Sequence, residues 1–222
     1  MTRRQTSGAP VPGAPAGLRE RKKRRTREAL LHAALRLFTT QGYDRTTVDE
    51  IVDAVEVSQR TFFRYFANKE AVAFAVQEAV DARFLAELRQ RPATEAPFEA
   101  MRRAALNAWS TLAEADEKDI TAELQMRAYR MIESTPALHA AHTQRNIGLE
   151  QQTALLIAER EGLDLETDPR PRVAVAAFSG VMRMTGQLWG RRKDAGADAL
   201  RELTELHLDQ LGPALSGSWR AA

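Results

Sequence analysis

The segment at residues 46–66 constrains the fold most, because it contains two helix starts separated by a short turn. Thr47 is followed three positions later by Glu50, which is the capping-box pattern of a helix N-terminus. Ser58 is a second N-cap residue. The spacing predicts helices over about 47–55 and 59–66, joined by a turn at Glu56-Val57. A tight turn of this kind sets two helices across one another.

The second of these helices has two different faces. Phe62 and Phe66 lie four apart and are expected to face inward. The outward positions are Gln59, Arg60, Phe63 and Arg64. Arg and Gln can hydrogen-bond base edges, and an apolar group can contact a thymine methyl. A plain helix hairpin with an incidentally basic face is the alternative, but the pattern favours a helix that enters a DNA groove.

Charge is distributed unevenly along the chain. Residues 1–70 contain 14 Lys and Arg against 8 Asp and Glu, whereas residues 71–222 contain 18 against 22. A basic N-terminal part and a mildly acidic C-terminal part indicate that only the N-terminal part binds a polyanionic partner.

The N-terminal part begins with a segment rich in Pro, Gly, Ala and Ser at residues 1–18, which we expect to be a disordered tail. The basic run at 19–27 follows it. We interpret this run as an arm that lies along phosphates or in a minor groove, in preference to a solvated charge run or the frayed start of a helix.

The remaining chain predicts an all-α fold with no strand. Apolar residues recur at helical spacing, and Gly42, Asn68, Pro92 and Gly162 provide cap and stop signals. About nine helices are expected, over 26–41, 47–55, 59–66, 69–90, 97–115, 118–132, 136–161, 172–189 and 198–211. We expect a DNA-binding domain at 19–84 and a larger helical domain at 85–215.

Several classes of protein are disfavoured. The chain has no cysteine, so disulfides and thiolate sites are excluded and a reducing cytoplasm is compatible. No apolar run is long enough to cross a bilayer, so no membrane association is expected. His139 and His142 could share a metal, but without a third ligand we interpret them as polar histidines, and we expect no metal, no cofactor and no catalytic set.

Residues 24–84 closely resemble the DNA-binding head of the TetR family of transcriptional regulators. The matching residues are Leu37-Phe38, Gly42, Thr47-Val48, Ile51, Ala54, Val57-Ser58, Thr61–Phe66 and Asn68-Lys69-Glu70. One departure is Glu56, where the family often has Gly in the turn. If this position needs a left-handed backbone, Glu costs about 1 kcal/mol.

The resemblance implies a homodimer with one recognition helix per subunit. By analogy, Gln59, Arg60 and Phe63 would reach base edges, and Arg64 would reach bases or phosphates. The residues implied to hold phosphates are Thr47, Thr61, Tyr65 and Lys69. Hydroxyl and ammonium groups grip the backbone without reading sequence.

The back half resembles the subgroup that includes mycofactocin-type regulators, through Thr135-Pro136-Ala137-Leu138, Arg127 and Trp189. That subgroup is similar to sensors of fatty-acyl ligands, which suggests an apolar or acyl-type effector. Six residues are candidates for a ligand pocket: Trp109, Met126, Tyr129, Arg130, Phe178 and Met182. Arg130 could hold an acidic ligand group, although Met and aromatic residues at helical spacing are more often core.

These observations predict a homodimeric, sequence-specific DNA-binding regulator, in the form of a ligand-released repressor that binds a pseudo-palindromic operator and dimerises through its last two helices. The alternatives are an activator or architectural DNA-binding protein without a ligand response, and a helical enzyme or carrier with a vestigial head.

Overall fold

The computed structural model describes residues 15–114, 121–192 and 197–217, and throughout these ranges the regular structure is helical. The all-α prediction is confirmed. In chain order the helices are α1 (Pro15–Gln41), α2 (Val48–Asp53), α3 (Gln59–Tyr65), α4 (Lys69–Ala73), α5 (Ala75–Gln90), α6 (Pro97–Glu114), α7 (Ala122–Ser134), α8 (Pro136–Glu161), α9 (Arg170–Arg191), α10 (Ala197–Asp209) and α11 (Leu211–Ser216).

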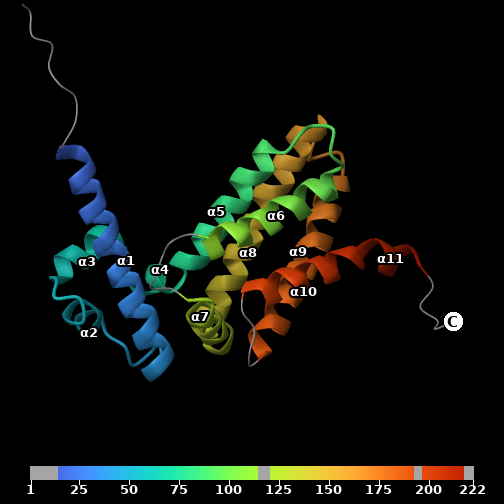
Figure 1. Ribbon diagram of the computed structural model, residues 1–222. Helices are drawn as coiled ribbons and strands as arrows, with labels where there is room; N and C mark the ends of the chain where they lie inside the picture. The colour runs from blue at the N-terminus through green and yellow to red at the C-terminus, as the bar shows by residue number, and fades with distance from the viewer. Residues whose placement is uncertain (1–14, 115–120, 193–196, 218–222) are drawn as a thin grey trace, which may run out of the picture.

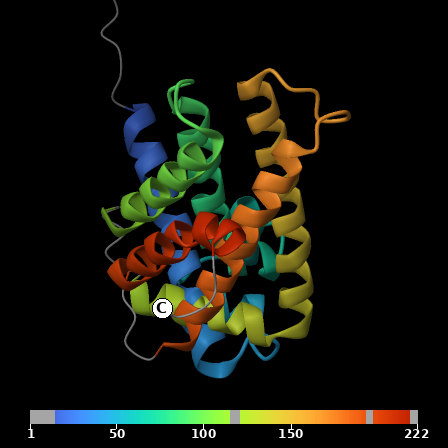
Figure 2. The same cartoon turned by 90° about the vertical axis from the view of Figure 1, so that its right-hand side faces the viewer.

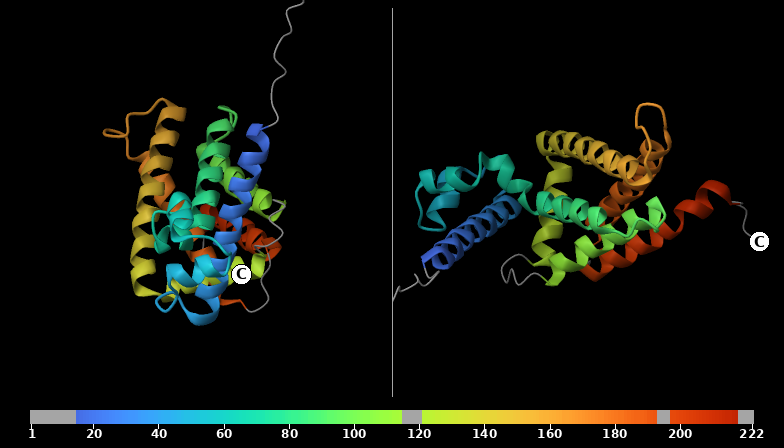
Figure 3. Two further views of the ribbon diagram at one scale, coloured as in Figure 1. Left: turned by 90° about the vertical axis from the view of Figure 1, so that its left-hand side faces the viewer. Right: turned by 90° about the horizontal axis from the view of Figure 1, so that it is seen from above.

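The helices form two groups, which we call the head (α1–α4) and the body (α5–α11). Figure 1 shows the head at one side of the molecule, with α2 and α3 packed beside the long α1. Seen from above in Figure 3, the head lies at one end and the body extends away from it. In Figure 2, α10 and α11 lie in front, on the side of the body that faces away from the head.

The predicted caps of the head are confirmed. Thr47 and Glu50 form a complete capping box at α2, and the side chains of Ser58 and Asn68 accept from the backbone at α3 and α4. These caps satisfy backbone N–H groups that a helix start leaves without partners. Phe62 and Phe66 are buried as expected, in a core shared with α1 and α2.

The start of the chain differs from the prediction. Residues 15–18, expected to be disordered, belong to α1, and the basic run at 19–27 is the N-terminal half of this helix instead of an extended arm. Arg, Lys and Glu are good helix formers, and Arg24 pairs with Glu28 one turn later at 3.3 Å. The rest of the expected tail, residues 1–14, lies outside the described residues.

Several helix boundaries also differ. The single helix expected at 69–90 is interrupted at Phe74, which ends α4 and begins α5. The last expected helix, 198–211, corresponds to α10, which ends at Asp209, and the short α11 follows it, so the described ranges contain more helices than the nine predicted. The expected start of the sixth helix, at 118, lies outside the described residues, and α7 is described from Ala122. By contrast, α8 has the predicted bounds and ends at Gly162, whose φ is 64°.

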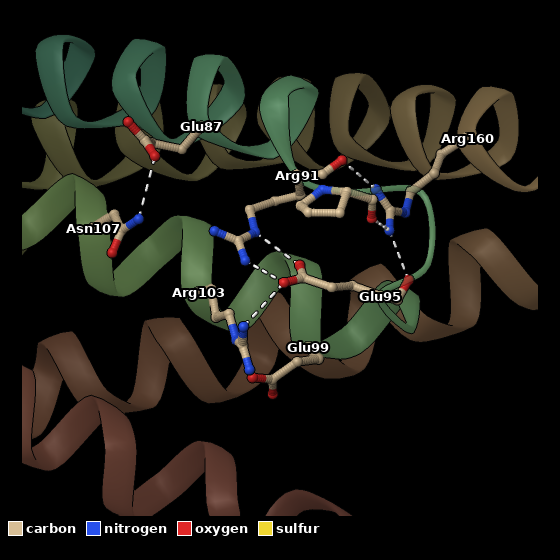
Figure 4. A network of polar contacts seen from close by, with 8 residues as sticks. Glu87, Arg91, Glu95, Glu99, Arg103, Asn107 and Arg160 are labelled. Atoms are coloured by element: carbon tan, nitrogen blue, oxygen red, sulfur yellow. Dashed lines mark hydrogen bonds and ion pairs between the residues drawn. The ribbon is translucent and has the colours of Figure 1, made fainter.

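Arg160, near the end of α8, holds the loop between α5 and α6. Its guanidinium donates to the carbonyl oxygens of Arg91 at 3.0 Å, of Glu95 at 2.6 Å and of Pro92. Figure 4 shows this contact beside the ion pairs of Glu95 with Arg91 and Arg103. The network fixes the end of the body farthest from α7. No helix in the described part of the chain is long and apolar enough to cross a membrane.

Helix α7 connects the body to the head. Its residues Leu124, Ala128, Met131 and Ile132 share a continuous apolar core with α1–α4. Arg127 donates to the carbonyl oxygen of Thr39, in the last turn of α1, at 3.0 Å. The other side of α7 packs against α8 and α9. A displacement of α7 within the body therefore has a direct path to the head.

Candidate functional site

Helix α3 presents the side chains that the sequence assigned to base contacts. Gln59, Arg60 and Arg64 are exposed, and Phe63 is 52% exposed although it is a large apolar residue. Phe62 is fully buried beneath them and packs edge-to-face on Phe63 with ring centroids 5.3 Å apart. The buried aromatic residue thus fixes the outward direction of the exposed one.

Two of these side chains are held by neighbours. The Gln59 amide donates to a carboxylate oxygen of Asp49 on α2. Arg64 donates to the Tyr65 hydroxyl at 3.3 Å and lies over its ring at 4.9 Å. Side chains oriented before binding lose less entropy on binding. Asp49 was not singled out in the sequence, because its contact with Gln59 depends on how α2 and α3 cross.

Thr47 and Thr61 lie at helix starts, where backbone N–H groups favour phosphate. The Thr47 hydroxyl contacts Glu50 at 3.1 Å, and the Thr61 hydroxyl lies 3.0 Å from that of Ser58. The hydrogen bond from the Thr47 backbone, followed by those from the Gln41 and Thr47 side chains, lowers the pKa of Glu50 below its usual value. The capping carboxylate is therefore charged at neutral pH.

Lys69 has a structural position that the sequence did not predict. Its ammonium donates to the carbonyl oxygens of Tyr43 at 2.8 Å and Thr46 at 2.9 Å, and it lies 4.2 Å from the centroid of the Tyr43 ring. Two of its three donors are thus used inside the head. Lys69 ties the loop before α2 to the start of α4, which leaves one donor for a phosphate.

A basic hollow lies between the N-terminal half of α1 and the end of α3. It has a volume of about 670 Å³. Its lining residues are Arg19, Glu20, Lys22, Lys23, Thr26, Arg64 and Tyr65. Because α1 is helical here, its backbone carries these exposed cations beside α3, in an arrangement suited to a phosphate backbone.

The body contains a second candidate site, a cavity of about 130 Å³ between α5, α6, α7, α8, α9 and α10. Four of the six predicted pocket residues line it, namely Trp109, Tyr129, Phe178 and Met182. The structure places the other two elsewhere. Met126 is buried in a core cluster with Trp189, Leu200 and Leu203, and Arg130 is exposed.

The cavity has one polar side that sequence reasoning missed. Asp81 lines it together with Gln77 and His142. Burial, more than any other effect, raises the pKa of the Asp81 carboxyl to about 6. Positions 77, 81 and 84 share one face of α5. Two polar residues on the same face as an apolar Phe84 are the sequence pattern that indicates a polar side of the cavity.

Tyr129 lines the cavity and packs closely against α9. A β-carbon at Gly186 would lie 2.8 Å from its hydroxyl oxygen, and one at Gly190 would lie 3.1 Å from its ring. The two glycines are four residues apart on one face of α9, so they allow the tyrosine to pack against the helix backbone. Burial raises the pKa of Tyr129 well above its usual value, so its hydroxyl is protonated.

Helix α9 also exposes an apolar stripe on its outer side. Val173, Met184 and Leu188 are exposed there, as is Leu206 on α10. Scattered exposed apolar residues are ordinary, but exposed apolar residues that recur on one face of a helix are typical of a protein interface.

Comparisons with known proteins identify both parts of the chain. Residues 30–76 match the family model described as "Bacterial regulatory proteins, tetR family", and residues 95–216 match the "MftR C-terminal domain". The HTH-type transcriptional regulator TcmR of Streptomyces glaucescens is 44% identical over 95% of this chain and 92% of its own. The chain belongs to the TetR family of transcriptional regulators.

Several solved structures share this fold. The fatty acid degradation regulator FadR from Bacillus halodurans has a TM-score of 0.57 at 21% identity, over 87% of this chain and 97% of its own. A SmeT–triclosan complex has a TM-score of 0.58 at 20% identity, over 86% and 91%. The TetR family consists of transcriptional regulators, so the enzyme alternative is set aside.

Proposed function

We propose that this TetR-family protein is a homodimeric repressor that binds a pseudo-palindromic operator and leaves it when an effector enters the body cavity. One observation carries the proposal. The outward face of α3 combines Arg60, Arg64 and Gln59 with an exposed Phe63, while the inward face is buried. This combination suits the major groove, where Arg and Gln read purines and an apolar ring meets a thymine methyl.

Phosphate contacts would surround this helix. Thr47, Thr61 and Tyr65 lie beside α3 or at helix starts, and the cations of the basic hollow extend the contact along the DNA backbone. These contacts position the head without reading sequence. Two heads related by a two-fold axis would then require half-sites about 34–36 Å apart.

Helix α7 would transmit effector binding to the head and so cause release of the operator. Tyr129 of α7 lines the cavity, and Arg127 of the same helix donates to Thr39 at the end of α1. A ligand that moves Tyr129 would shift α7 and change the position of the head. The ligand-bound population would then hold two recognition helices at a spacing that misses the grooves.

Selection of bound sequences from a random DNA pool, followed by fluorescence anisotropy on the selected site, tests the proposal. Arg60→Ala should weaken binding to the selected site by about 1–3 kcal/mol. It should also relax the base preference at one position in each half-site. Arg89→Ala, an exposed cation on α5, is the matched control and should leave affinity unchanged. Failure to enrich any sequence at low salt would refute the proposal.

A further inference from the structure

We propose that the effector is a small organic cation, an amine on a single aromatic or similarly sized apolar body, whose ammonium group binds Asp81. This inference rests on the proposed effector-responsive function, because it names the ligand class of the same cavity. Four features of the cavity carry it: aromatic walls, a carboxylate without an ion pair, paired charges elsewhere and a small volume.

Aromatic side chains form a large part of the cavity wall. Phe84 and Phe178 stack with ring centroids 5.9 Å apart and planes 12° apart. Tyr129 and Trp189 meet edge-to-face at 6.2 Å, and Trp109 also lines the cavity, beside aliphatic residues such as Val80 and Leu149. Aromatic faces attract both flat apolar groups and cations, and the attraction to a cation grows when water is excluded.

Asp81 has one hydrogen-bond donor and no ion pair in the described ranges. The Gln77 amide donates to one of its carboxylate oxygens at 3.1 Å. The other titratable groups near it are Glu78 on its own helix and His142 and Arg145 on α8. With a pKa of about 6, the Asp81 carboxyl is mostly ionised at neutral pH despite its burial.

Both neighbouring basic side chains on α8 contact other carboxylates. Arg145 pairs with Glu78 and lies 3.7 Å from Glu70. The Nδ1 atom of His142 lies 2.8 Å from Glu133. Asp81 is therefore a half-buried carboxylate whose neighbouring basic groups contact other carboxylates. Partial removal of such a charge from water is costly until a counter-charge reaches it.

The remaining charges of the lining disfavour an acidic ligand. Glu150 and Arg183 face one another at 3.8 Å, so the arginine already has a carboxylate partner. Arg130, which the sequence suggested for an acidic group, does not line the cavity. An anion entering here would approach Asp81 and Glu150, whereas an ammonium group would pair with Asp81 against the aromatic walls.

The volume limits the size of the ligand. A cavity of about 150 Å³ holds one benzene ring in another protein. The 130 Å³ observed here therefore suits one ring with a short amine arm. A larger amine would have to displace Tyr129, which is the side chain that contacts α9 and belongs to the helix that reaches the head.

Three probes of equal size test the inference without DNA: benzylamine, benzyl alcohol and benzoate. Binding is measured by calorimetry at pH 7.5 to wild type, Asp81→Asn and the control Glu166→Gln, whose carboxylate is exposed on the loop before α9. We expect benzylamine to bind wild type at least tenfold more tightly than benzyl alcohol, and benzoate to bind least. Asp81→Asn should remove the preference for the amine, and Glu166→Gln should keep it.

Tighter binding of benzoate than of benzylamine, an amine preference that survives Asp81→Asn, or no binding of any probe would overturn the inference. The amine preference of wild type should also weaken from pH 7.5 to pH 5, as Asp81 is protonated. Failure of the proposed function looks different: benzylamine would bind as expected, but the protein would select no operator from the DNA pool.

Discussion

Tyr129 on α7 lies so close to Gly186 on α9 that a β-carbon at position 186 would be 2.8 Å from the tyrosine hydroxyl oxygen and 3.2 Å from the ring carbon that bears it. The glycine therefore permits a contact that no other residue would allow without movement. Because Tyr129 lines the cavity and α7 reaches α1, this contact lies on the path between ligand and DNA.

Gly186→Ala should lower the free energy of unfolding by about 1–2 kcal/mol, since overpacking outweighs the gain of about 1 kcal/mol in helix propensity. Urea denaturation measures the change. Gly148→Ala in α8 is the matched control, because a β-carbon there meets nothing within 4 Å. It should raise the free energy of unfolding by up to about 1 kcal/mol.

A second substitution separates the tyrosine contact from other effects at position 186. Tyr129→Phe removes the closest atom, so the double variant Gly186→Ala/Tyr129→Phe should regain part of the lost stability. Equal losses with and without the hydroxyl would show that the contact does not limit packing here.

Glu56 adopts a φ of 55°, the only positive φ of a non-glycine residue in the described chain. The left-handed backbone suspected from the sequence is confirmed. Glu56→Gly should stabilise the head by about 1 kcal/mol, because glycine reaches this conformation without strain. Thermal denaturation should show a higher midpoint, while affinity for the selected operator stays the same. A lower midpoint would mean that the Glu56 side chain makes a stabilising contact.

The features that could be predicted from the sequence are local ones. The capping box at Thr47, the cap at Asn68 and the left-handed end at Gly162 each depend on a few adjacent residues, and all three are observed. The start of α1 differs from the sequence pattern, in which Pro, Gly and Ala indicate a disordered tail. Proline is tolerated in a first helical turn, so Pro15 can begin the helix that the charged residues continue.

Features that depend on tertiary packing could not be predicted in this way. The ammonium of Lys69 reaches carbonyl groups more than twenty residues earlier in the chain, which only the packing of α4 against α1 makes possible. Asp81 has a raised pKa because helices distant in sequence enclose it. Arg130 is a pocket candidate from its position in the sequence, but the orientation of α7 about its axis places this side chain at the surface.

Lys69→Met tests the structural position of that residue. The variant keeps the apolar stem but leaves the Thr46 carbonyl oxygen without the ammonium donor, so the head should lose about 1–3 kcal/mol of stability. A residue that only held phosphates would leave stability unchanged. Lys23→Met, an exposed cation of the basic hollow, is the control: it should reduce DNA affinity and the salt slope without lowering stability.

Asp81→Asn should change stability in a pH-dependent way. The folded-state pKa is raised to about 6 from a usual 3.8, so the folded protein binds the extra proton and stability falls as pH rises between these values. Removing the carboxyl should therefore stabilise the protein by up to about 3 kcal/mol at pH 7.5 and have little effect at pH 4. Urea denaturation at both pH values checks this, and an equal effect at both would contradict it.

Met184→Glu should dissociate the proposed homodimer, because it places a charge in the exposed apolar stripe of α9. Light scattering coupled to size exclusion should then give the mass of one chain, and affinity for the full operator should fall towards that of one half-site. Leu155→Glu on α8 is the matched control, since Leu155 is also exposed but lies outside the last two helices. A Met184→Glu dimer together with a Leu155→Glu monomer would place the interface on α8 instead.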